Sequence, residues 1–456
     1  MHEWTDTGGC VMLRRMGETV DPKGAVVKIK DASFPAPFAS ELEYNSPVHG
    51  NWNIVHTGMQ VPESIQIYVC ADNCMRGVVL TAAEMNAADR FSFVILEEQD
   101  LLNSNLEDIT IEGVTDVLNK RGDHPKAVLL FTVCLHHFVG SNLDYIYSEL
   151  EHRFPDICFI RCYMDPIMQK HGLTPDQKLR KAMYDPLPVC EPNAKTVSVF
   201  GSDFALDESS DIKRLLKRYE YTVQELPACK TWQDLLDMSK GSLFIDCYPA
   251  GKYGMETQAE RLGRKRLYLP GSFDYDEIER QLKQLTDVLG LPELTENELA
   301  HERENCEEAL TRAKDLIKDM PITLDYLYHP RPLGLAKLLL THGFCVKAVY
   351  LDGISPEEKD EFIWLQEHAP ELELIATIQV KMRVLPRGGS EEVLAIGQKA
   401  AYFSRSRHFV NLVQGEGLYG FAGIRRTAEL MMEAYREEKD TEKLVVQKGW
   451  GCECCL

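Results

Sequence analysis

Short, continuous apolar runs recur along the chain, and amphipathic stretches lie between them. Continuous apolar runs are typical of strands that are buried on both faces of a parallel sheet, because half-exposed strands alternate apolar and polar residues. The stretches between the runs, for example residues 142–153 and 273–288, have the pattern of amphipathic helices. The order therefore predicts an α/β fold with parallel β-sheets flanked by helices. The apolar runs are SIQIYVC, FSFVILEE, KAVLLFTVC, ICFIRCY, TVSVFGS, SLFIDCYP, KRLYLPG, LDYLYHP, CVKAVYLDG, LELIATIQV and HFVNLVQG.

The strand–helix pattern starts again near Ala194 and near Met320. The segment CEPNAKTV marks the first boundary, and a long charged helix that ends at Pro321 marks the second. A chain of 456 residues has room for about three domains of roughly 150 residues each. We therefore expect three Rossmann-like domains. The expected units are an N-terminal extension at 1–55, domains at 56–193, 194–319 and 320–445, and a cysteine-rich tail at 446–456.

The charge balance argues against two classes of partner. Lys and Arg number 50 and Asp and Glu number 71, which gives a formal net charge of −21. This sign repels nucleic acid and anionic membranes, so neither is expected to bind. The chain contains no long uninterrupted apolar stretch, and its first residues lack the pattern of a signal peptide. A cytoplasmic location is the expectation.

The chain has 14 cysteines, a high number for a cytoplasmic protein. In a reducing compartment they do not form a disulfide framework, so some are better interpreted as metal ligands or catalytic thiols. Cys70, Cys134, Cys162 and Cys247 each close an apolar run. Ligands of open parallel sheets bind beyond the carboxyl ends of the strands, where these thiols would lie. Cys74 lies at a helix start, where the helix dipole favours the metal-binding thiolate.

The spacing of the cysteines favours iron–sulfur over zinc. Structural zinc sites usually pair their ligands as C-x₂-C, whereas Cys70 and Cys74 form C-x₃-C and Cys134 lies far along the chain. Thiolates from separate loops suit an iron–sulfur cluster better. Packing of these cysteines in the core is the alternative, since cysteine is a common buried residue.

Three segments carry a family resemblance: SPVHGNWNIVHTG, VCADNC and FTVCLHHFVGSNLD. They resemble the start of nitrogenase component 1 and of relatives such as the dark-operative protochlorophyllide reductase and the chlorophyllide reductase. Cys74 matches the second cysteine of the family pattern and Cys134 the third. The first cysteine position falls on Ser46, which is a departure from the pattern. Cys70 is the candidate to replace that thiolate, and Cys10 is a weaker one.

Two later segments extend the resemblance. FIDCYPAGKYGMETQAERLG is similar to the nitrogenase segment that carries the cysteine ligand of the catalytic metallocluster, and Cys247 is the matching position. VNLVQGEGLYGFAGIRR, with Gly415 and Gly417, is similar to the glycine-rich loop beside that cofactor. The position of the family's histidine ligand falls on Val410. The ligand set is therefore incomplete, and dinitrogen reduction is not implied.

The resemblance implies a reductive function. A separate ATP-dependent iron protein would deliver electrons to a [4Fe-4S] or larger P-cluster-like iron–sulfur cluster bound by Cys70, Cys74 and Cys134. The cluster would reduce a substrate in the cleft between the domains, with Cys247 binding a second metallocluster or the substrate in its place. The chain has no G-x-x-x-x-G-K-[ST] motif, which fits a separate ATPase. A non-catalytic scaffold for metallocluster assembly is the alternative function, and a metal-free three-domain binding protein is the third.

Three cysteines are too few for a four-thiolate cluster, so a homodimer or a paralogous heterodimer is expected to complete it. In LYHPRPLG, His329 and Arg331 follow a strand of the third domain, where the arginine could hold an anionic substrate. The glycines at 415 and 417 could present N–H groups to an anion. An ordinary turn and tight packing are the respective alternatives. The tail residues Cys452, Cys454 and Cys455 are candidates for metal binding or for burial at a partner.

Overall fold

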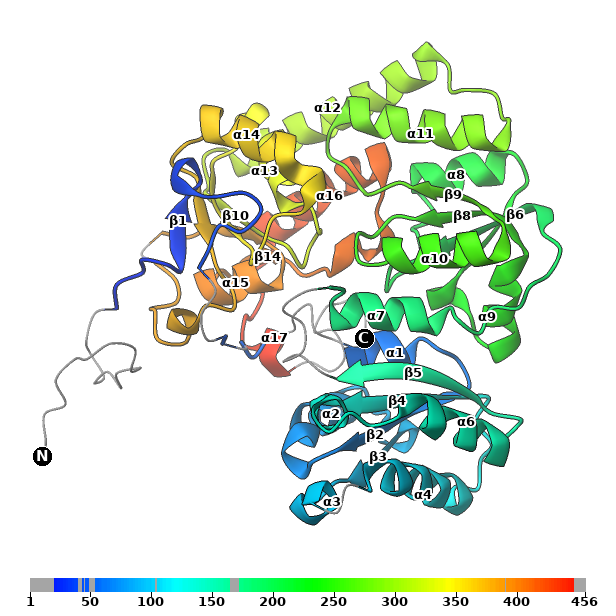
Figure 1. The fold of residues 1–456 in the computed structure, drawn as a ribbon. Coiled ribbons are helices and arrows are strands. Elements are labelled where there is room, and N and C mark those ends of the chain that lie inside the picture. The colour runs from blue at the N-terminus through cyan, green and yellow to red at the C-terminus, as the bar shows by residue number, and fades with distance from the viewer. Residues whose placement is uncertain are drawn as a thin grey trace, which may run out of the picture.

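The computed structural model shows three β-sheets flanked by helices, so the predicted α/β fold is confirmed (Figure 1). One sheet with its helices forms the lower lobe, and the other two sheets lie above it. The structure describes residues 20–39, 43–44, 46–48, 54–102, 105–164, 172–389 and 391–446.

The first sheet has four parallel strands in the order β3-β2-β4-β5. Every residue of its two central strands is buried, which explains why their sequences are apolar without alternation. The strands are β2 (Ser64–Cys70), β3 (Phe91–Ile95), β4 (Ala127–Val133) and β5 (Cys158–Met164). The helices are α1 (Ile54–Met59), α2 (Asp72–Glu84), α3 (Glu98–Leu102), α4 (Leu106–Lys120), α5 (Cys134–Phe138) and α6 (Leu143–Arg153).

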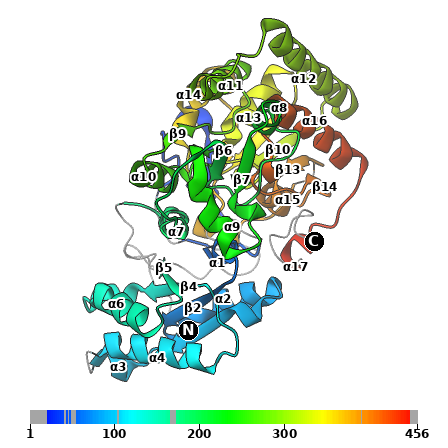
Figure 2. The same ribbon diagram turned by 90° about the vertical axis from the view of Figure 1, so that its right-hand side faces the viewer.

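The second sheet is also parallel, with the order β7-β6-β8-β9. Its strands are β6 (Asn193–Phe200), β7 (Thr222–Glu225), β8 (Gly241–Asp246) and β9 (Lys265–Tyr268). Its helices are α7 (Pro175–Met183), α8 (Asp211–Arg218), α9 (Trp232–Asp237), α10 (Lys252–Leu262) and α11 (Tyr275–Leu289). Helices α1 and α7 pack against each other between this sheet and the first one (Figures 1 and 2).

The third sheet has the order β1-β12-β11-β10-β13-β14. Strand β1 (Val26–Lys28) is antiparallel to β12 (Glu373–Ile375), so part of the expected N-terminal extension closes this sheet. The other strands are parallel: β10 (Ile322–Asp325), β11 (Val346–Tyr350), β13 (Leu394–Ile396) and β14 (His408–Val410). The helices are α12 (Glu296–Ile317), α13 (Pro332–Thr341), α14 (Lys359–His368), α15 (Gln398–Ser404), α16 (Gly420–Arg436) and α17 (Lys443–Val446).

Buried apolar residues link the sheets unequally. The second and third sheets contribute to one large core, which includes Val197, Ile245, Leu324 and Ile396. Helix α12 packs against α16 within it. The first sheet buries one face in its own core and the other in a core that it shares with Phe200 and Phe244 of the second sheet. The upper two sheets are therefore the more extensively fused pair. Among the helices that the structure describes, none has the length and apolar composition needed to cross a bilayer.

Candidate functional site

Two predicted ligands, Cys74 and Cys134, lie at the same edge of the first sheet. Strands β2 and β4 are adjacent and parallel, with Val69 opposite Thr132, so the segments after them leave the sheet side by side. Cys74 lies in the first turn of α2, and Cys134 is the first residue of α5. The Cys74 side chain is exposed and Cys134 is half-buried. Solvent and a second chain therefore have access to this edge.

Cys70 has different surroundings. It ends β2, and its side chain is buried in the core with Tyr68 and Phe131. Burial, and secondarily the nearby Cys74, raise the pKa of the Cys70 thiol to about 12. Burial also raises the pKa of Cys74, followed by the influence of Cys134 and Asp72. The protein environment thus opposes the thiolate that the helix start was expected to favour.

The donor set of this edge fits only part of a cluster. In the part of the chain that the structure describes, no three His, Cys, Asp or Glu side chains are grouped to hold a metal ion. Cys74 and Cys134 are accessible thiols on adjacent segments, whereas Cys70 faces the core. One chain therefore offers two ready donors, with a third below them, and ligation by all three stays a prediction.

Large apolar side chains are exposed on the segments around this edge. Leu102, at the end of α3, is 82% exposed, and Phe138, at the end of α5, is 59% exposed. We call the exposed apolar side chains at and after the ends of β3 and β4 the rim set; it consists of Ile95, Leu102, Phe138, Val139 and Tyr145.

Cys247 lies at the corresponding edge of the second sheet, directly after Asp246 at the end of β8. Burial, and secondarily Asp246, raise the pKa of its thiol well above the usual value. Asp246 is fully buried, and its Oδ1 accepts the Tyr248 N–H at 2.6 Å. Its Oδ2 has no hydrogen-bond partner among the described residues and lies tightly against Gly201 and Gly251. Backbone therefore fills the space beside this carboxyl group, and a role of Cys247 in binding a second group stays a prediction.

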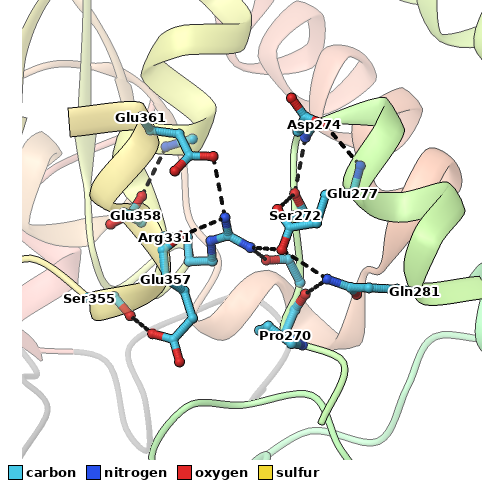
Figure 3. Close-up of polar contacts among 12 residues, drawn as sticks. Pro270, Ser272, Asp274, Glu277, Gln281, Arg331, Ser355, Glu357, Glu358 and Glu361 are labelled. Carbon is cyan, nitrogen blue, oxygen red and sulfur yellow. Dashed lines mark hydrogen bonds and ion pairs between the residues drawn. The ribbon is translucent and has the colours of Figure 1, made fainter. Parts of the chain in front are cut away.

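Arg331 was predicted to hold an anionic substrate, and the structure surrounds it with protein (Figure 3). Its guanidinium donates to Glu277 Oε1 at 2.7 Å and to Glu361 Oε1 at 3.4 Å. The carbonyls of Gly271 and Glu357 accept two further bonds, at 3.2 and 3.1 Å. The side chain is 2% exposed. These contacts join α11 to α14 and leave little of the guanidinium for a ligand.

His329 is equally enclosed. Its Nδ1 accepts the Arg331 N–H at 3.1 Å, and its ring meets the edge of Phe273 at 4.8 Å between centroids. Burial, followed by the charge of Arg331, lowers its pKa to about 3, so the ring is neutral. A Cβ atom on Gly271 would lie 2.6 Å from Nε2. The cavity beside His329, which Gly415 also lines, measures about 10 Å³, enough for roughly one water molecule.

Gly415 and Gly417 belong to the loop between β14 and α16. Gly417 packs so closely on Ala205 that a Cβ atom would overlap its carbonyl oxygen, and Gly417 O accepts the Asp207 N–H at 3.0 Å. The start of α16 already has an anionic cap, because Asp211 Oδ2 accepts the Phe421 N–H at 2.5 Å. Close packing is what the structure shows here, and anion binding stays a prediction.

Sequence reasoning missed a polar cluster at the carboxyl edge of the third sheet. The Lys399 Nζ donates to Tyr326 Oη at 2.7 Å and to Thr377 Oγ1 at 2.8 Å. Lys399 is 2% exposed, and burial lowers its pKa, against the opposing influence of Asp352 and Asp325. The members come from segments after four different strands, so no local spacing marks them. The lysine two residues after Gly397 was the one available signal.

The remaining cysteine candidates and the polar residues of the segments that resemble the family have simple roles or lie outside the described residues. His136 is buried; its Nδ1 accepts the Val133 N–H at 3.3 Å, and its Nε2 lies 3.2 Å from Thr110 Oγ1. Ser46 is buried, and its hydroxyl donates to Val48 O at 3.5 Å. The residues outside the described ranges are Cys10, His49, Cys452, Cys454 and Cys455.

Two solved structures share this arrangement of sheets. The structure titled "Nitrogenase Cp1 at pH 6.5" matches with a TM-score of 0.64 and 12% identity, over 87% of this chain and 94% of that chain. The structure titled "Nitrogenase Cp1 at pH 5" matches with a TM-score of 0.58 and 12% identity, over 90% of this chain and 94% of that one. At this identity the likeness shows the fold. No curated protein matches this chain.

A comparison of the sequence with known protein families identifies the family of this chain. The family of nitrogenase component 1 type oxidoreductases matches residues 112–437, which is most of the chain. This chain belongs to that family, and the resemblance noted in its sequence is confirmed. The matched range includes Cys134, Cys247 and the loop that carries Gly415, whereas Cys70 and Cys74 precede it.

Proposed function

We propose that this chain is the electron-accepting component of a nitrogenase-like reductase and that it holds an iron–sulfur cluster at the edge of the first sheet. Cys74 and Cys134 are the principal ligands, with Cys70 below them. One observation carries the proposal: two accessible thiols lie on adjacent segments at the carboxyl edge of a parallel sheet, in a family of oxidoreductases. This edge is where open α/β sheets place their ligands.

An iron–sulfur cluster bound at this edge would accept and release single electrons. Because the pKa values of Cys70 and Cys74 are raised, binding must displace their protons. Cluster assembly on the purified protein is therefore expected to be faster and more complete at pH 8.5 than at pH 6.5.

A second chain is needed to complete the ligands. A four-thiolate cluster takes four donors, and one chain supplies at most three here. A twofold axis beside Cys74 and Cys134 would double the donors and cover the rim set with its own copy. A paralogous chain in the same position would do likewise. The electron donor is proposed to be a separate ATP-dependent iron protein.

The enclosed surroundings of Arg331 and His329 favour the alternative function as a scaffold for metallocluster assembly. Arg331 bonds to Glu277 and Glu361, and His329 packs against Phe273, so both predicted substrate-binding side chains are engaged by protein. If the chain is a scaffold, it passes its cluster on and has no substrate. Turnover by the purified protein with an iron protein, ATP and a reductant distinguishes the two functions.

The cluster itself is tested by single substitutions in anaerobically reconstituted protein. Cys74→Ser and Cys134→Ser are expected to lose iron, sulfide and the EPR signal of the reduced cluster. The matched control is Cys158→Ser, because Cys158 is a half-buried thiol at the opposite end of the same sheet. It should retain the wild-type iron content. If Cys74→Ser and Cys134→Ser both retained the wild-type iron content, the proposed site would be refuted.

A further inference from the structure

Four consecutive residues in the loop between β14 and α16 have a left-handed backbone. The φ values are +51° at Gln414, +61° at Gly415, +48° at Glu416 and +76° at Gly417. Glycine adopts such values freely, but Gln414 and Glu416 have a Cβ atom that disfavours them. Non-glycine residues persist in this region only when surrounding contacts hold them there. The loop is therefore strained, and its contacts must compensate.

The contacts that hold Gln414 come from another sheet. Its side-chain Nε2 donates to Asp203 Oδ2 at 2.5 Å, and its Oε1 accepts the backbone N–H of Asp203 at 3.1 Å. Asp203 follows β6 in the second sheet, whereas Gln414 follows β14 in the third. The backbone N–H of Gln414 donates to Leu327 O at 2.7 Å. The glutamine thus makes a reciprocal pair with one residue that is 211 positions away.

Asp203 also accepts hydrogen bonds from α1 and the residue after it, a segment that leads into the first sheet. Thr57 Oγ1 of α1 donates to its Oδ1 at 3.2 Å, and Gln60 Nε2 does so at 3.3 Å. Arg180 of α7 donates to its Oδ2 at 2.8 Å, and the Asp203 side chain is 1% exposed. Helix α1 runs directly into β2, which ends at Cys70. One buried carboxylate therefore contacts segments that belong to all three sheets.

We infer that the Asp203–Gln414 pair is a conformational joint. It keeps the loop 414–417 in its strained form and, through α1 and α7, fixes the first sheet against the other two. When the pair separates, the loop is free to relax to negative φ, and Thr57 and Gln60 no longer share their partner with the third sheet. Relaxation of the loop and loosening of α1 and α7 on Asp203 are thus two results of one event. The inference does not depend on a bound cluster.

Gln414→Glu tests the joint with almost no change in shape. Two carboxylates then face each other in a buried position and repel. Amide exchange in residues 54–60, 175–183 and 414–420 is expected to become about tenfold faster at pH 8, the factor for the loss of one hydrogen bond to a charged group. Gln233→Glu is the matched control, because Gln233 donates to Asp237 at 2.7 Å on an exposed helix. The control should leave all three segments unchanged.

Unchanged exchange in 54–60 and 175–183 in Gln414→Glu would overturn the inference. If Gln414→Glu does not fold, Gln414→Met removes the hydrogen bonds without adding charge. Slow wild-type exchange in α1 and α7 of that variant would overturn the inference equally.

Discussion

The edge of the first sheet and the junction of the second and third sheets differ in what they expose to solvent. At the first edge, Cys74 is exposed and large apolar side chains such as Leu102 lie in solvent. At the junction, Arg331 is 2% exposed and engages two carboxylates. Exposed apolar surface is available to another molecule, whereas buried ion pairs already have their partners. The comparison supports the proposal that the first sheet binds a partner, and the ion pairs of the junction join α11 to α14.

Breaking the junction is expected to have the largest effect on stability. Arg331→Met leaves Glu277 and Glu361 without their cation in a poorly solvated position, which costs about 3–5 kcal/mol. Denaturant unfolding measures the change. The control is Arg303→Met, whose partners Glu279 and Asp276 also lie on α11 but in a more exposed pair. Its expected cost is about 0–1 kcal/mol. Equal costs for the two variants would show that the junction is not specially stabilising.

Charging the rim set is expected to weaken self-association without destabilising the fold. Phe138→Asp places a carboxylate in the proposed interface and should reduce association by on the order of 2 kcal/mol. Ile363→Asp is the control, since Ile363 is 43% exposed on α14 of the third sheet. Anaerobic sedimentation measures both variants. Unaltered association of Phe138→Asp would place the interface on another surface.

Glu358 makes the stability of the junction depend on pH. Burial raises its pKa to about 8, so the folded protein favours the neutral carboxyl group. Its contribution is fully present below the ordinary pKa of about 4.5 and is lost as the pH rises toward 8. Glu358→Gln should therefore show a smaller decline of the melting temperature between pH 5 and pH 8 than the wild type. Glu367→Gln, on the exposed part of α14, should decline as the wild type does.

The smallest expected effect comes from relieving backbone strain at Glu220, in comparison with Gln414, whose side chain bonds to Asp203. Glu220 has a φ of +59° just after α8, and glycine there should stabilise the protein by about 1 kcal/mol, because glycine avoids the left-handed penalty. The same change at Gln414 also relieves strain but removes the pair with Asp203. Its net effect is expected to be destabilising. Thermal unfolding of the two glycine variants measures the difference, and stabilisation by both would contradict a holding role for Asp203.

The longer buried strands were predictable because local pattern determines them. KAVLLFTVC contains β4, although Cys134 belongs to the following helix. LDYLYHP was expected to be a strand, yet β10 ends at Asp325 because that carboxylate accepts the N–H groups of Leu327 and Tyr328 and turns the chain. Three-residue strands such as β1 and β13 have too few residues for a recognisable period.

The candidate site was also predictable from the sequence only in part. That Cys74 and Cys134 lie at the same edge was predictable, because parallel strands place their carboxyl ends together, whereas the adjacency of β2 and β4 is known only from the structure. The partners of Arg331 do not, because Glu277 and Glu361 come from two other helices. A strand-end arginine looks the same in sequence whether it faces a ligand or a carboxylate. Its surroundings are decided by tertiary packing.

Strand β1 has a consequence for how the protein is made. Val26 pairs with Ile375, so the sheet joins an early and a late part of the chain. During synthesis, residues 26–28 leave the ribosome long before residues 373–375 exist, and they remain unpaired until most of the chain has been translated. The pairing of β1 with β12 therefore forms only after the segments of the other two sheets have been translated. A fragment that begins at residue 320 would have β12 as a bare outer strand, open to pairing with other chains.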